Sequence, residues 1–113
     1  MEKKLRVKNK IEFQGIIKSK KFISNEAYVV YYQSKAKEIN RYGITVGKKL
    51  GNAVVRNKVK RQVRMIVYEL SCFSLEYDCI IIVREKYINN KYIHNKELLR
   101  KLLYKLKERK NEN

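Results

Sequence analysis

The sequence contains no proline and only four glycines in 113 residues. Because proline and glycine punctuate loops and linkers, their scarcity argues against a flexible connection between two domains. A chain of this length is the usual size of a single domain and can bury a core of its own. We therefore expect one folded domain that spans residues 1–113.

Cysteine and histidine are also scarce, with Cys72, Cys79 and His94 as their only representatives. The two cysteines stand seven residues apart, which is not a metal-binding spacing, and one histidine cannot complete a zinc site. We expect two small, buried or half-buried thiols in a reducing compartment. His94 is interpreted as a residue flanking a helix rather than as a base, and no metal site is predicted in the protein.

Acidic residues number only 11 and are scattered, with no D-x-D or H-x-x-x-H spacing. A protein nuclease needs paired carboxylates for metal ions, or histidine and lysine for acid–base work. The sequence therefore predicts no catalytic residue.

A membrane-spanning segment is missing too, since no run of 18 apolar residues occurs. The first ten residues are charged and contain no apolar signal segment. We expect a cytoplasmic protein with no membrane partner and no small-molecule substrate.

Positive charge, in contrast, is abundant. Lys and Arg number 28 against 11 Asp and Glu, which gives a net charge of +17. A folded domain with this charge repels itself and is best neutralised by a polyanion. Nucleic acid is the leading candidate partner.

The hydrophobic pattern alternates between helical and strand periods. Asn9 and Glu12 have the spacing of a helix capping box, Asn52 is placed to cap a long helix, and Asn95 could cap the last one. The expected helices are 10–18, 53–70 and one from Asn95 onward, and the expected strands are 22–23, 27–33, 41–47 and 79–84. This order, α-β-β-β-α-β-α, predicts an α+β fold with a mixed four-stranded sheet and three helices, which we place on one face of the sheet.

The strongest functional signal lies in residues 48–64, KKLGNAVVRNKVKRQVR, where seven of seventeen residues are basic and none is acidic. A helix places Arg56, Lys60 and Arg64 on one line, where like charges destabilise the helix unless an external anion relieves them. Arginine grips phosphate in two places, and Asn57 can touch a base edge or a ribose hydroxyl. These features favour nucleic-acid binding without distinguishing RNA from DNA.

The same run resembles the "RNR" motif of the bacterial ribonuclease P protein component, typically K-x-G-N-A-V-x-R-N-[RK]-[IV]-K-R. The resemblance extends along the chain, because Arg6, Val7, Glu12 and Phe13 match an N-terminal R-[LV]-x-x-x-x-[DE]-F pattern and residues 78–84 match D-x-I-I-I-x-R. This family has an α/β sandwich fold with a left-handed β-α-β crossover, against the general preference for a right-handed one.

The resemblance implies an RNA-binding subunit of ribonuclease P, an endonuclease that hydrolytically removes the 5′ leader from precursor tRNA. The catalytic RNA subunit would perform the reaction, with Mg²⁺ bound mainly by that RNA and by the substrate, and the protein alone would not cleave. The implied RNA-contacting residues are Lys48, Lys49, Asn52, Arg56, Asn57, Lys58, Lys60, Arg61 and Arg64. The implied cleft for the 5′ leader contains Phe13, Ile17, Val29, Tyr31, Lys60 and Arg64.

One position departs from the family pattern, because Ile17 stands where many members carry a second aromatic residue on the first helix. An isoleucine cannot stack on a base, so leader binding would depend more on Phe13, Tyr31 and charge. Periodicity alone favours core positions of an amphipathic helix for Phe13 and Ile17, and only the resemblance brings the cleft role level with that interpretation. The alternatives to the ribonuclease P assignment are a ribosomal-type structural RNA-binding protein, a basic DNA-binding protein and a free-standing nuclease.

Overall fold

The computed structural model describes residues 6, 7, 9–70 and 75–109 of the chain. Its elements follow in the order α1 (Lys10–Lys18), β1 (Phe22–Ser24), β2 (Tyr28–Ser34), β3 (Tyr42–Val46), η2 (Lys48–Leu50), α2 (Ala53–Leu70), β4 (Tyr77–Val83), η3 (Glu85–Asn89) and α3 (Tyr92–Glu108). The four strands form one sheet in the order β1-β2-β4-β3. The predicted α+β fold, with a mixed four-stranded sheet and three helices, is confirmed.

The sheet is mixed because of one connection. β2 pairs antiparallel with β1 and with β4, whereas β3 pairs parallel with β4 in the register from Tyr42 opposite Cys79 to Val46 opposite Val83. The chain passes from β3 to β4 through α2, which makes the expected β-α-β unit. The left hand of this crossover stays a prediction.

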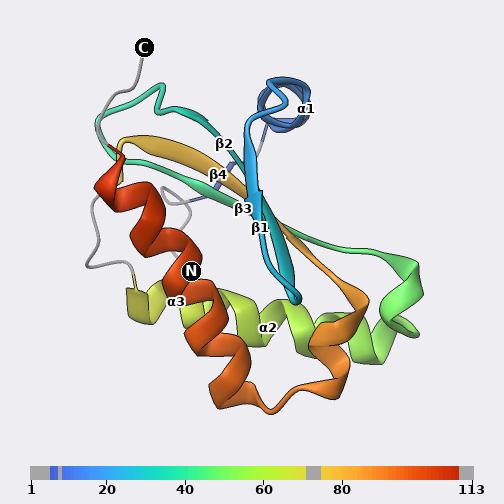
Figure 1. Cartoon of the computed structure of the whole chain (residues 1–113). Coiled ribbons are helices and arrows are strands. Elements are labelled where there is room, and N and C mark those ends of the chain that lie inside the picture. The colour runs from blue at the N-terminus through green and yellow to red at the C-terminus, as the bar shows by residue number, and fades with distance from the viewer. Residues whose placement is uncertain (1–5, 8, 71–74, 110–113) are drawn as a thin grey trace.

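The helices cover both faces of the sheet, so the expectation that all three lie on one face was wrong (Figure 1). α2 and α3 cover one face, and the larger core lies between them and the sheet. α1 lies on the opposite face over a smaller cluster built around Ile80. The physical reason is in β4, whose apolar run from Cys79 to Ile81 is fully buried, because a strand that is apolar on both sides needs cover on both.

Two of the three predicted helix caps are present. The Asn9 side chain accepts hydrogen bonds from the backbone N–H groups of Ile11 and Glu12, at 2.8 and 3.4 Å. The Asn52 side chain accepts one from Val55 N–H at 3.0 Å. These bonds satisfy donors that the first turn of a helix leaves unpaired.

Asn95 does not cap α3, which begins three residues earlier at Tyr92 and includes His94. The Asn95 side chain is instead buried, donating to the Tyr87 carbonyl at 2.9 Å and accepting from Asn90 at 3.0 Å. A buried amide must be satisfied in this way, so Asn95 fixes α3 against η3 rather than starting the helix.

The cysteine prediction is confirmed for Cys79, which is a fully buried free thiol whose pKa is raised by burial. Cys72 lies outside the described residues.

Candidate nucleic-acid interface

The basic run of residues 48–64 lies on η2 and along α2. The helix turns its apolar side, including Val59 and Val63, into the larger core, which leaves the basic side chains on the outside. Among the predicted RNA-contacting residues, Arg56, Lys60 and Arg64 are half-buried along one line of the helix. The others are exposed: Lys48, Lys49, Asn52, Asn57, Lys58 and Arg61.

None of the seven basic side chains in this run has a carboxylate oxygen within 4.0 Å among the residues that the structure describes. Basic residues elsewhere in the chain do form ion pairs, such as Lys96 with Glu69 and Arg100 with Glu97. Within α2, the Nε atom of Arg56 is buried and lacks a hydrogen-bond partner in the described part of the chain. The cations stacked along this helix repel one another and have no acidic partner in the described ranges, so the surface is suited to bind a polyanion.

The entrance to α2 is shaped by Gly51, whose φ of +146° lies in a region that side chains rarely adopt. A Cβ atom at Gly51 would also lie 3.0 Å from the Cβ of Val55. The sharp turn brings η2, with Lys48 and Lys49, next to the start of the helix. Asn52 uses its Oδ1 for the cap, so its amide NH₂ is the group left to meet an RNA.

The other predicted site, the cleft, is built between α1 and the sheet. Phe13 and Ile17 of α1 and Tyr31 of β2 pack on the same apolar cluster as Ile80 of β4. Phe13 and Ile17 are therefore partly core residues, as their periodicity suggested. Both side chains are only half-buried, so part of each remains accessible to solvent. Val29 is half-buried on the same face of β2 as Tyr31, opposite Ile82.

A pocket of about 130 Å³ continues this cleft around the β3 edge of the sheet. Its lining residues are Arg6, Val7, Phe13, Tyr42, Gly43, Ile44 and Arg64. The pocket brings Arg64 of the basic helix together with Phe13 of the cleft. Lys60 is not part of the lining and lies one helical turn before Arg64. Arg6 was matched in the N-terminal pattern without a role, and its place in this pocket could not be found from spacing.

Gly43 allows Phe13 to lie directly on β3. A Cβ atom at this position would come within 2.7 Å of Ile80 Cδ1 and 2.8 Å of Phe13 Cε2. The bare glycine backbone is therefore the floor on which the Phe13 ring rests, which is a use of glycine that the sequence alone did not reveal.

We expect Gly43→Ala to destabilise the protein by about 1–3 kcal/mol, because the added methyl group overpacks the floor of the cleft. It should also displace the Phe13 ring. Urea unfolding would measure the loss of stability, and Gly47→Ala is the matched control because a Cβ atom there meets nothing within 4 Å. Equal stabilities for the two variants would contradict the close packing of Phe13 on Gly43.

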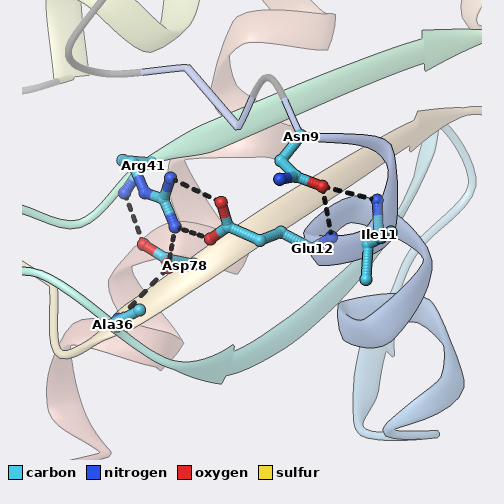
Figure 2. A network of polar contacts seen from close by, with 6 residues as sticks. All are labelled: Asn9, Ile11, Glu12, Ala36, Arg41 and Asp78. Atoms are coloured by element: carbon cyan, nitrogen blue, oxygen red, sulfur yellow. Dashed lines mark hydrogen bonds and ion pairs between the residues drawn. The ribbon is translucent and has the colours of Figure 1, made fainter.

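An ion network that is buried at Arg41 and Asp78 and partly exposed at Glu12 links α1 to the sheet (Figure 2). The Arg41 guanidinium binds both oxygens of Glu12 on α1 and donates to Asp78 Oδ2 at 3.2 Å. Asp78 in turn accepts from the backbone N–H groups of Arg41 at 2.7 Å and Ala36 at 3.4 Å. The hydrogen bonds from Arg41 hold the pKa of Glu12 below its usual value, and the same contact raises the pKa of Arg41. We call these three side chains the Arg41 network.

The Arg41 network explains why Glu12 forms only half of the predicted capping box. Its carboxylate turns toward Arg41 and does not return to the backbone of Asn9. Glu12 and Asp78 were both matched in family patterns, but the link between them runs through Arg41, 29 and 37 residues away in sequence. Pattern spacing carries no signal for such a contact.

The described residues contain no group of three or more His, Cys, Asp or Glu side chains placed to hold a metal ion. The Nε2 atom of His94 lies 3.5 Å from Oε1 of Glu26. Within the described ranges, no helix is long and apolar enough to cross a bilayer.

Comparison with known proteins gives consistent matches along the chain. A protein-family model described as Ribonuclease P matches residues 1–107. The ribonuclease P protein component of Mesoplasma florum is 45% identical over 107 residues, which cover 91% of this chain and 96% of the relative. That of Mycoplasma capricolum is 44% identical over 109 residues, covering 95% and 100%.

Solved structures agree with the sequence matches. The ribonuclease P protein of Staphylococcus aureus superposes with a TM-score of 0.78 at 36% identity, covering 88% of this chain and 93% of that one. The protein of Thermotoga maritima superposes with a TM-score of 0.77 at 30% identity, covering 94% and 98%.

Proposed function

This chain belongs to the ribonuclease P protein family and is the protein subunit of that endoribonuclease. We propose that its two surfaces bind different RNAs. The basic face, formed by the seven Lys and Arg side chains of residues 48–64 on η2 and α2, binds the catalytic RNA subunit. The cleft between α1 and the sheet binds the single-stranded 5′ leader of precursor tRNA. The ribosomal-type and DNA-binding alternatives are not favoured by these matches.

The observation that carries this proposal is the continuity of the two surfaces at Arg64. The basic face has seven cations without an acidic partner in the described part of the chain, and its last member also lines the pocket beside Phe13. An RNA lying on α2 can therefore deliver a strand directly into the cleft. Phosphates would meet Arg64, and a base would meet the Phe13 ring.

In this scheme the protein's contribution is positional and electrostatic. Its cations neutralise phosphates where the RNA subunit and the substrate approach each other, which lowers their mutual repulsion. The cleft fixes the leader, so that the scissile bond is presented to the RNA in one orientation. Mg²⁺ held by the RNA subunit and the substrate would activate the attacking water. A cytoplasmic location, where precursor tRNA is made, belongs to the same proposal.

The direct test is reconstitution with a bacterial ribonuclease P RNA and a leader-bearing precursor tRNA at low Mg²⁺ concentration. We expect strong stimulation of leader release over RNA alone, and no cleavage by the protein alone. Tight RNA binding without stimulation would favour a structural RNA-binding role instead. Cleavage by the protein alone, with a nuclease-free control, would favour a free-standing nuclease.

A further inference from the structure

An exposed aromatic side chain extends the leader cleft to the other edge of the sheet. Phe22 of β1 is 52% exposed, and its ring lies 5.3 Å from that of Tyr31 at an angle of 45°. The two residues are direct partners across β1 and β2, so their side chains share one face of the sheet. That face is the one under α1, where Tyr31 packs with Phe13 and Ile17.

The turn between α1 and β1, which leads into Phe22, is rich in positive charge. Lys18, Lys20 and Lys21 are exposed and directly precede Phe22. None of the three has a carboxylate oxygen within 4.0 Å in the described ranges. The φ of +60° at Lys20 marks a tight turn that joins the helix to the strand without a long loop. An accessible ring beside unpaired lysines is the pattern that binds single-stranded nucleic acid, with the base on the ring and phosphates on the lysines.

The Phe22 ring can replace the aromatic side chain that many family members carry at the position of Ile17. α1 offers only one aromatic side chain to the cleft, Phe13, because Ile17 is aliphatic. Phe22 supplies the second aromatic surface from β1 instead. We propose that Phe22 and Tyr31 form a stacking platform for one base of the 5′ leader, with Lys20 of the adjoining turn meeting an adjacent phosphate. This inference rests on the proposed leader-binding function and adds a second contact point to it.

The sheet order sets where on the leader this contact falls. β1 and β3 are the two edges of the sheet, with β2 and β4 between them. Three interstrand spacings of about 4.8 Å separate them, so the platform lies about 14 Å across the sheet from the pocket at Gly43 and Arg64. Because α2 and its RNA surface lie at the β3 side, the platform receives a nucleotide farther from the cleavage site than the one at Phe13.

The test measures the affinity of the reconstituted holoenzyme for precursor tRNAs whose leaders are lengthened one nucleotide at a time. For the wild type, affinity should rise again when the leader becomes long enough to reach Phe22. Phe22→Ala and Phe22→Leu should lose that second rise, by about fivefold or more, because neither side chain stacks on a base. Phe22→Tyr should keep it. Ile93→Ala is the matched control, since Ile93 is 71% exposed on α3.

The possible failures are distinguishable. If Phe22→Ala follows the wild type along the whole leader series, the platform is wrong while leader binding stands. If Phe22→Ala weakens leaderless tRNA by the same factor, Phe22 does not contact the leader and the platform is again wrong. If the wild type shows no dependence on leader length, the proposed leader-binding function itself fails. Circular dichroism of each variant confirms that its fold is retained.

Discussion

Replacing Arg41 by alanine is expected to destabilise the protein by about 3–5 kcal/mol, the cost of breaking a buried ion pair by removing one partner. The Arg41 side chain is 6% exposed and that of Asp78 is 3% exposed. Without the guanidinium, the Asp78 carboxylate keeps only its backbone donors and is left as an uncompensated charge in the interior. Glu12 also loses its partner, so α1 loses its ion pair to the sheet. Thermal unfolding should show a Tm lower by about 10 °C or more.

The matched control is Arg100→Ala, which removes the same side chain from an exposed ion pair. Arg100 and Glu97 are 41% and 46% exposed and stand three residues apart on α3. Such a surface pair contributes at most about 1 kcal/mol. A Tm for Arg41→Ala within a degree or two of that for Arg100→Ala would show that the Arg41 network does not hold the fold together.

The contrast between these two arginines shows what the sequence could and could not predict. Local signals were sufficient for the elements: the cap at Asn9 and the apolar spacing along α2 placed both helices at their observed bounds. The buried run of β4 identified a central strand. The basic face needed only helical geometry, because its residues lie on one short segment.

Contacts between segments that are distant in the sequence could not be predicted from such local patterns. The position of α1 on the second face of the sheet depends on Arg41, which binds Glu12, and on Gly43, whose missing side chain makes room for Phe13. Arg41 and Glu12 are 29 residues apart in the sequence. Asn95 looked like a helix cap because its own segment is polar, whereas its burial is decided by η3 folding over it. The sequence predicts Phe22 only as a strand residue, because its ring contact with Tyr31 depends on the pairing of β1 with β2.

Salt is expected to have the largest effect on assembly with the RNA subunit. Each phosphate that the protein neutralises releases counterions, so the logarithm of affinity falls with the logarithm of salt concentration at a slope of about −0.7 to −0.9 per contact. If about six of the unpaired cations on η2 and α2 each meet a phosphate, affinity should fall roughly a thousandfold between 50 and 200 mM monovalent salt. Filter binding or fluorescence titration across this range measures the slope, and a flat response would contradict an electrostatic interface.

The variant Arg56→Ala measures how much one cation of the basic face contributes to this slope. We expect the variant to weaken assembly and to reduce the slope by nearly one, because it removes one phosphate contact from the basic face. Lys105→Ala is the control for a loss of charge alone, since Lys105 is an exposed cation on α3. Its slope should match the wild type. Because the two variants have the same net charge, a difference between their slopes can come only from where the charge lies. Equal slopes for both would mean that the RNA responds to the overall charge of +17 and not to the face formed by α2.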